Sequence, residues 1–399
     1  MRKDILENVK INGQPFHKLI VITDDDNNVL LLPLLYAVHL DRIGTSFRYI
    51  QRKDDDGKEY KELAEGILSE SSIPTYFSYI SKFHNYLNEL AKSVENISTH
   101  QVYKCDSYFV NDYLNDFLVE SGIKSIDEHK AALDGYFNFL SHIGICHSLD
   151  LAIYAKSRQR VAELDETKNV IKYVSRDHRH LLQMACKSKA EKLILRMGHE
   201  VGLRAAENCG LLLKKEKETD TNNGLQSLFD QLEEDKNKSK FRYHLQGKYT
   251  KNGRPRDIYF NKELLLALKD YVETERQDMI DVNDYQHDYL FVRSDNGCEG
   301  LPIATWHASN VFSKRKVNIP GLDQELTYHA LRHTFATELF YQNLLDKSGR
   351  ETRSESAALI NVAIRLGHKL DRKEGKAPST TTIYIRLLEE MKDIEGMAA

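Results

Sequence analysis

The sequence predicts a mainly helical protein with a small β-sheet, in which a helical domain precedes a mixed α+β domain. Proline occurs only 7 times in 399 residues while Leu, Lys, Glu and Ala are abundant, a composition that favours helix over sheet. Apolar residues recur at helical spacing along several stretches. Two short alternating stretches flank a turn-like segment in the second half and predict one β-hairpin.

The length and composition indicate a globular chain of more than one domain. A chain of 46.1 kDa exceeds one ordinary domain, and 29% charged residues are typical of a globular protein. The longest apolar runs, such as Val29–Leu35, are too short to span a bilayer, and we expect a cytoplasmic protein without a membrane partner. Five scattered cysteines, with no Cys-x-x-Cys pair, argue against a disulfide framework and a zinc site.

Residues 1–65 are expected to form a small mixed unit whose role stays open. Lys18–Thr23 is a β-branched run that precedes the turn-rich Asp24–Asn28, and the apolar stretch from Val29 would complete a hairpin. A second turn signal, Asp54–Gly57, lies between polar stretches that resemble strands. No chemistry is assigned to this part.

A compact helical domain is predicted for residues 66–160. An apolar stripe at positions i, i+3, i+4 and i+7 runs through Tyr76, Tyr79, Ile80 and Phe83. Two further helices are expected at Ser107–Glu120 and Ile126–Ile143, each followed by a glycine. The polar and charged segment Lys156–Asn169 is the best candidate for a linker.

Residues 170–399 are expected to form the mixed domain. Its hairpin would pair Phe241–Gln246 with Asp257–Phe260 around the turn-like Tyr249–Arg256. Its helices are expected at Ser175–Gly198, Leu264–Arg276, Trp306–Lys316, Ala330–Asn343 and Ser356–Leu366, with Ser175 as an N-cap.

The charge of the chain is uneven. A net charge of −4 and a pI of about 6.5 weigh against a general nucleic-acid binder. The acidity lies in residues 1–160, which hold 18 basic and 23 acidic residues, while the remainder holds 38 and 37. Within that remainder, Lys236–Arg256 carries eight basic residues and no acidic one. The total therefore conceals a local cationic segment.

Five motifs in the second half combine into a specific pattern. They are Gly202-Leu203-Arg204-Ala205-Ala206-Glu207, Gly247-Lys248-Tyr249-Thr250-Lys251, His329-Ala330-Leu331-Arg332-His333-Thr334-Phe335-Ala336-Thr337, Leu366-Gly367-His368 and Ser379-Thr380-Thr381-Thr382-Ile383-Tyr384. Each alone is weak, because a helical arginine is usually a solvated ion-pair partner and Tyr384 is one of 21 tyrosines. In this order and with these flanks, the series resembles the tyrosine recombinase family of phage integrases and Xer-type recombinases, over about residues 170–390.

The resemblance implies an architecture and a reaction. Residues 66–160 would be a SAM-like core-DNA-binding domain and residues 170–399 the catalytic domain. The family cuts DNA with a tyrosine hydroxyl, holds the strand as a 3′-phosphotyrosyl intermediate, and rejoins it without metal, ATP or another cofactor. The chain contains no G-x-x-x-x-G-K-[ST] phosphate-binding loop.

The same resemblance assigns the catalytic residues: Arg204, Lys248, His329, Arg332, His368 and Tyr384. Arginines suit this chemistry because a guanidinium donates two hydrogen bonds to phosphate oxygens and stays charged. Lys248 would be the general acid for the leaving 5′-oxygen, with Lys251 as a competitor. Glu207 is either a buried carboxylate supporting the site or an ordinary surface acid. The long spacing from His368 to Tyr384 leaves open whether Tyr384 acts in its own subunit.

Backbone contacts to DNA are expected from the cationic segment, whose alternative is a solvated charged loop. The residues concerned are Lys236, Lys238, Lys240, Arg242, Lys251, Arg254 and Arg256. The partner would be double-stranded DNA, bound by a homotetramer on two sites that is a dimer or monomer off DNA, with accessory or partner recombinase proteins and a nucleoid location. The sequence thus predicts a site-specific recombinase or integrase, and we expect it to belong to a mobile element. Alternatives are a type IB topoisomerase-like enzyme and a catalytically silent DNA-binding factor.

Overall fold

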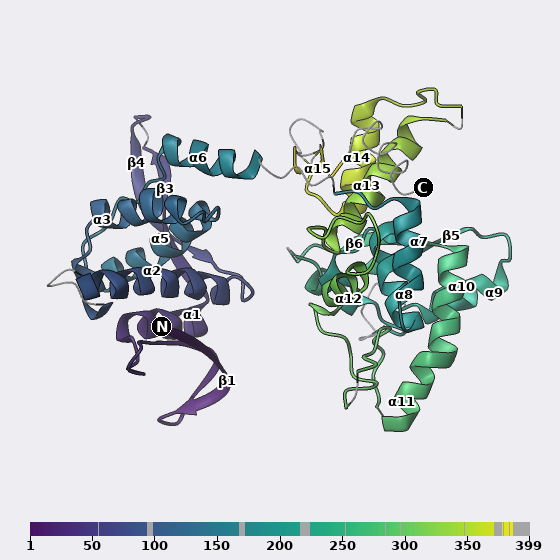
Figure 1. Cartoon of the computed structure of the whole chain (residues 1–399), viewed down its shortest axis with the longest axis horizontal. Coiled ribbons are helices and arrows are strands. Elements are labelled where there is room, and N and C mark those ends of the chain that lie inside the picture. Colours follow the sequence, from purple (N-terminus) through teal and green to yellow (C-terminus); the bar gives the residue numbers. More distant parts are fainter. Residues whose placement is uncertain are drawn as a thin grey trace. The chain divides into compact units, whose positions relative to one another are not determined.

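The computed structural model comprises two compact units, Met1–Asn169 and Val170–Ala399, each with an apolar core of its own (Figure 1). The structure describes residues 1–54, 56–93, 99–166, 172–215, 224–251, 253–283, 285–295, 297–346, 348–370, 377, 379–382 and 384–385.

The first unit opens with an antiparallel hairpin of β1 (Arg2–Ile11) and β2 (Gln14–Thr23). Its turn is Asn12-Gly13, and both residues have positive φ, 49° and 77°. A two-residue Asn-Gly turn of this kind matches the right-handed twist of the paired strands. The predicted pairing of β2 with the stretch from Val29 is therefore wrong, and only a single bridge joins Thr23 to Val29.

The apolar stretch after Val29 forms α1 (Leu31–Ile43) instead of a strand. Pro33 lies in the first turn of this helix, where the missing N–H has no intrahelical partner to lose. The helix ends at Gly44, which has the left-handed φ of 74°. A second hairpin follows, with β3 (Thr45–Lys53) and β4 (Glu59–Ile67) on either side of the predicted turn Asp54–Gly57, of which Asp55 lies outside the described residues.

Helices complete the first unit. They are α2 (Ile73–Ser93), η1 (Thr99–Lys104), α3 (Ser107–Asp112), η2 (Tyr113–Phe117), α4 (Leu118–Glu120), α5 (Ile126–His142) and α6 (Ala155–Glu166). The predicted helix Ser107–Glu120 is present with a π-helical turn in its middle. The segment predicted as a linker is instead largely helical as far as Glu166, because Lys, Arg, Gln, Glu and Ala are good helix formers whatever their polarity.

The core of the first unit is rich in aromatic side chains. Tyr36 of α1 stacks on Phe77 of α2 with ring centroids 5.8 Å apart, and it also contacts Tyr136 of α5. Leu19 and Ile20 of β2 are buried in the same cluster. The first 65 residues and the helices after them thus share one core.

The second unit surrounds the predicted hairpin with helices. Strands β5 (Lys240–Leu245) and β6 (Arg256–Asn261) pair antiparallel and contact α9, α10 and α14. The helices are α7 (Arg176–Met184), α8 (Lys189–Arg196), η3 (Met197–Val201), η4 (Ala205–Gly210), α9 (Gln226–Glu234), η5 (Gly247–Tyr249), α10 (Lys262–Tyr271), η6 (Val272–Arg276), α11 (Gln277–Asn283), α12 (His307–Lys316), α13 (His329–Leu344), α14 (Glu355–Leu366) and α15 (Ser379–Thr382). Ser175 caps α7, since its hydroxyl accepts the N–H of His178.

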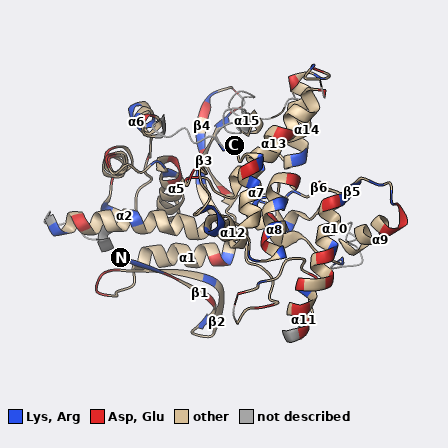
Figure 2. Cartoon of the chain, turned by 45° about the vertical axis from the view of Figure 1, so that its right-hand side comes forward, with Lys and Arg blue, Asp and Glu red and all other residues tan. Residues whose placement is uncertain are grey.

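The surface carries both signs of charge. Figure 2 shows acidic and basic residues together on α10 and α14. No described helix is both long and apolar enough to cross a bilayer.

Candidate active site

A buried carboxylate stands at the centre of the site. Glu207, in η4, is 1% exposed and follows directly on the turn that carries Arg204. Its oxygens accept hydrogen bonds from the backbone N–H of Arg204 at 2.8 Å, from Arg204 Nη1 at 2.8 Å and from Arg256 Nη2 at 2.7 Å. Arg332 Nη1 lies 3.6 Å away. One carboxylate therefore contacts three guanidinium groups and is not a surface acid.

The three cations keep this carboxylate ionised. Burial alone would raise the pKa of Glu207, but the charges of Arg256, Arg332 and Arg204 outweigh it and lower that pKa to about 2. A negative charge at this position offsets part of the repulsion among the arginines, which allows them to lie close together.

Arg332, in α13, forms hydrogen bonds to the C-terminal ends of two other helices. Its side chain is 0% exposed, and it donates from Nη1 to the carbonyl of Gly202 at 2.5 Å and from Nη2 to the carbonyl of Leu366 at 2.6 Å. Gly202 and Gly367 end their helices in the left-handed conformation, so these carbonyls lie where helical hydrogen bonding stops. Burial, with the charges of Arg256 and Arg204, lowers the pKa of Arg332 to about 9, which leaves it protonated at neutral pH.

Tyr384 lies against the residues of its own chain. Its Oη is 2.9 Å from Nε2 of His329, and its ring centre is 5.8 Å from the guanidinium carbon of Arg332. The ring of His333 stacks on it, with centroids 4.2 Å apart and planes 17° from parallel. Between His368 and Tyr384 the structure describes residues 369, 370, 377 and 379–382, and Tyr384 itself reaches the site without a second subunit.

His368 completes the group of polar side chains around Tyr384. Its ring centroid is 5.2 Å from that of Tyr384, and its Nδ1 is 2.9 Å from the hydroxyl of Thr381. Burial, followed by the charges of Arg332 and Arg204, lowers the pKa of both His329 and His368 to about 4. Both imidazoles are therefore neutral at neutral pH and able to accept or donate a proton.

The two candidate lysines lie in the turn that follows β5. Lys248 Nζ lies 4.8 Å above the ring of Tyr249, and that ring packs against Gly210. Lys251 acts electrostatically on the site: after burial and the two arginines, the charges of Lys172 and Lys251 also lower the pKa of His329. The structure thus brings Arg204, His329, Arg332, His368 and Tyr384 together, with Lys251 within electrostatic range.

Comparison with known proteins indicates the family that the chain resembles. The model described as "Phage integrase family" matches residues 165–347. Transposase A from transposon Tn554 of Staphylococcus aureus is 26% identical over 346 residues, which cover 84% of this chain and 86% of that protein. Tyrosine recombinase XerD of Rickettsia bellii is 22% identical over 283 residues, 69% of this chain and 82% of that protein. Together these similarities indicate a tyrosine recombinase.

A solved structure shares the fold of this chain. The XerH site-specific recombinase, in a post-cleavage complex with its palindromic difH substrate, has a TM-score of 0.53 at 16% identity. The match covers 81% of this chain and 78% of XerH. This likeness confirms the mainly helical fold with a small β component.

The cationic segment, residues 236–256, divides into two groups. Lys240 and Arg242 are exposed on one face of β5, and Arg242 pairs at 3.6 Å with Asp257. Arg256 differs, because it is 6% exposed and donates to the carbonyls of Arg365 and Gly202 as well as to Glu207. The guanidinium of Arg256 thus links three parts of the site, and its expected contact with a DNA phosphate stays a prediction. The remaining members are Lys236, Lys238, Lys251 and Arg254, all in segments that border β5 or β6.

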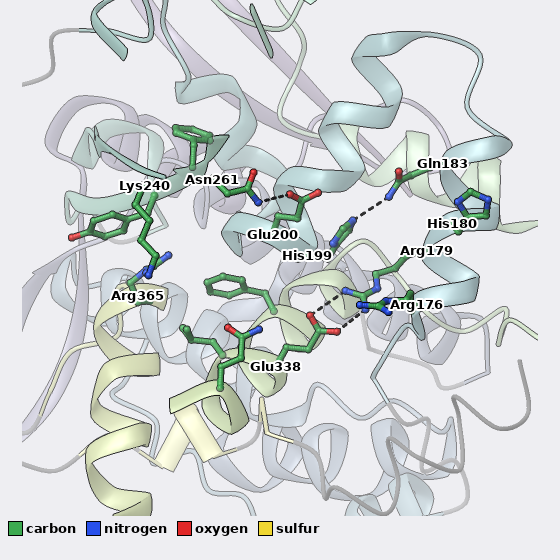
Figure 3. A pocket seen from close by; sticks show the side chains of 15 residues that line it. Arg176, Arg179, His180, Gln183, His199, Glu200, Lys240, Asn261, Glu338 and Arg365 are labelled. Atoms are coloured by element: carbon green, nitrogen blue, oxygen red, sulfur yellow. Dashed lines mark hydrogen bonds and ion pairs between the residues drawn. The ribbon is translucent and has the colours of Figure 1, made fainter. Parts of the chain in front are cut away.

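A pocket of about 820 Å³ lies on another side of α13 (Figure 3). Its lining includes Glu338, which forms an ion pair with Arg179, and Glu200, which accepts a hydrogen bond from Asn261. The α13 residues that line it are separated by roughly half a helical turn from His329, His333 and Thr337, so the pocket is distinct from the candidate active site.

Two residues of the third motif that touch Tyr384, His333 and Thr337, were given no role by the sequence pattern. Thr337 donates its hydroxyl to the Tyr384 carbonyl at 2.9 Å, and His333 stacks on its ring. Their spacing was a usable signal, because positions 329, 333 and 337 recur every four residues on one helix face. Arg256 and Lys172 carry no comparable signal, since their relation to the site depends on the tertiary fold.

Proposed function

We propose that this chain is a site-specific DNA recombinase of a mobile element that cuts and rejoins strands through a 3′-phosphotyrosyl intermediate on Tyr384. The observation that carries the proposal is the 2.9 Å contact between Tyr384 Oη and His329 Nε2, immediately beside the buried guanidinium of Arg332. A phenol, a neutral base and fixed cations are what a metal-free attack on phosphate requires. Similarity to a transposase over most of both chains supports the mobile-element assignment.

In the proposed first step, Tyr384 Oη forms a bond to phosphorus while the bond from phosphorus to the 5′-oxygen breaks. His329 accepts the phenol proton, because its imidazole is neutral and already in contact with Oη. Arg204 and Arg332 stabilise the charge that develops on the non-bridging oxygens. Arg332 Nε is buried without a hydrogen-bond partner among the described residues, which leaves a donor available to an anion. His368 donates a further hydrogen bond to the phosphate.

The leaving 5′-oxygen needs a proton, and we assign it to a lysine of the turn after β5. Lys251 is favoured over Lys248, since its charge acts on His329 while Lys248 lies over the ring of Tyr249. In the second step a 5′-hydroxyl from the partner strand attacks the phosphotyrosyl bond and each proton returns. The covalent bond conserves the energy of the phosphodiester, so strand rejoining requires no other high-energy compound.

The proposed partner is double-stranded DNA, bound by four subunits across two sites. XerH shares this fold and is bound to its palindromic difH substrate in a post-cleavage complex. Exposed Lys240 and Arg242 would contact phosphates and make the affinity depend on salt without reading sequence. A contact between Tyr384 and its own chain supports cleavage in cis within each subunit.

A covalent-trapping experiment tests the proposal. Nicked duplexes made from the DNA that flanks the gene should form a covalent protein–DNA adduct in the wild type and none in Tyr384→Phe. Tyr108→Phe, which alters a tyrosine that is 79% exposed, is the matched control and should form the adduct normally. Adduct formation by Tyr384→Phe would overturn the assignment of the nucleophile. Efficient relaxation of a plasmid without any such site would instead indicate a topoisomerase-like enzyme.

A further inference from the structure

One face of α13 contacts Tyr384 at three successive turns. His329, His333 and Thr337 are four residues apart, so their side chains lie one above another. His329 contacts the phenol oxygen, His333 covers the ring face, and Thr337 holds the backbone carbonyl. The oxygen, ring plane and main chain of Tyr384 are thus each held by a different residue of one helix.

We propose that His333 and Thr337 are positioning residues that hold Tyr384 in register for attack in its own subunit. The inference rests on the proposed role of Tyr384 as the nucleophile. Neither residue reaches the phosphate in this scheme; both act through the tyrosine, and His329 alone takes its proton.

The helix that carries these residues is itself fixed on its other sides. Thr334 accepts the backbone N–H of Val174 at 2.9 Å, and Glu338 pairs with Arg179 at 2.6 Å. Arg332 is tied to two carbonyls. His333 is 2% exposed and Thr337 is 0% exposed. The face that meets Tyr384 is therefore rigid, which is what a positioning surface needs.

Among the residues that the structure describes, one short helix leads into Tyr384. The helix before it, α15, spans only Ser379–Thr382, and the backbone N–H of Tyr384 bonds back to the carbonyl of Thr381 at 3.1 Å. A single helical turn is not stable by itself. The placement of Oη therefore depends on contacts to α13. A displacement of about 1 Å in a reacting group can reduce a rate on the order of a hundredfold.

The test compares matched variants on two readouts. Thr337→Val removes the hydroxyl at constant volume, Thr337→Ser retains it, His333→Ala removes the ring and His333→Phe retains a stacking ring. Thr334→Val is the control, because it removes a buried hydroxyl from the same helix that does not touch Tyr384. The first readout is the single-turnover rate of adduct formation on the nicked flanking duplex at saturating protein. The second is the rate of chymotrypsin cleavage after Tyr384 in the DNA-free protein, with thermal melting as a check on folding.

We expect Thr337→Val and His333→Ala to slow adduct formation about tenfold or more and to speed cleavage after Tyr384. Thr337→Ser and His333→Phe should keep adduct formation and cleavage after Tyr384 close to their wild-type rates. Thr334→Val should change neither rate beyond its effect on melting. Equal behaviour of Thr337→Val and Thr334→Val would overturn the inference. If no variant and no wild-type protein forms an adduct, the proposed function fails, while the proteolysis readout still decides whether His333 and Thr337 hold Tyr384.

Discussion

Oη of Tyr384 lies 2.9 Å from Nε2 of His329, although 55 positions separate the two residues in the sequence. The contact joins the last motif of the chain to the first residue of α13, and it does so within one subunit. His329 has its pKa lowered to about 4 by burial and by neighbouring arginines, so at neutral pH this contact pairs a phenol with a neutral imidazole. The predictions below address the charges, protons and contacts around that pair.

Glu207→Gln should strongly destabilise the second unit. The change removes the carboxylate that contacts three arginines, two of them buried, and breaking a buried ion pair typically costs about 3–5 kcal/mol. Trp306, the only tryptophan, lies in this unit, so its fluorescence during urea unfolding measures the effect there. Glu233→Gln, which alters an ion pair whose carboxylate is 67% exposed, should cost less than about 1 kcal/mol. Similar losses in both variants would contradict this account.

The stability of the second unit should fall as pH drops from about 6.5 toward 4. The folded state holds His329 and His368 neutral down to a pKa of about 4, while the unfolded chain takes up protons near the ordinary value of 6.5. Above about pH 6.5, the pKa of the unfolded chain, these two histidines do not reduce the free energy of unfolding. Below that pH protons bind preferentially to the unfolded chain, so the free energy of unfolding falls. Urea midpoints at pH 7 and pH 5 should differ less in His329→Gln than in wild type. Replacing the exposed His180 with Gln should leave the difference unchanged.

Substitution of Arg256 should lower stability, whereas substitution of Arg242 should weaken DNA binding. Arg256→Met removes a buried guanidinium that bridges Glu207 and two carbonyls, and we expect lower stability and a slower adduct-forming step. Arg242→Ala alters a side chain that is 70% exposed, so stability should change by less than about 0.5 kcal/mol. Arg242→Ala should weaken binding to a labelled duplex. It should also reduce the slope of log affinity against log salt concentration by about one, the value for one lost phosphate contact. Unchanged DNA binding in Arg242→Ala would remove it from the contact surface.

Lys251→Ala should slow cleavage by roughly 10²–10⁴-fold, the usual range for losing a general acid. A duplex with sulphur in place of the bridging 5′-oxygen should restore the rate, because a thiolate leaves without being protonated. Lys248→Ala should change the cleavage rate of both substrates only slightly. Rescue of Lys248→Ala, with no rescue of Lys251→Ala, would assign the proton to Lys248.

Local sequence patterns predicted the helices and strands that depend mainly on interactions between residues close in sequence. The β5–β6 hairpin, the N-cap at Ser175 and the helix of His329–Leu344 follow from alternation, capping chemistry and apolar spacing. The first hairpin was assigned the wrong partner, because β2 can pair on either side and its choice of β1 depends on the Asn12-Gly13 turn and on the shared core. The predicted linker is largely helix α6, since polarity distinguishes surface from core but not coil from helix.

The sequence by itself predicted the family, the proposed reaction and the residue types for it, because the arginine, histidine and tyrosine motifs are local and their order is distinctive. Only the tertiary structure decided which side chains meet. Arg256 is buried, unlike the exposed cations beside it in the sequence. Glu207 is buried too, and it contacts three guanidinium groups. The packing of Tyr384 on α13 brought it to His329 within its own chain. Such contacts arise between segments distant in sequence, where the free energy of burying apolar and charged groups, rather than local propensity, sets the arrangement.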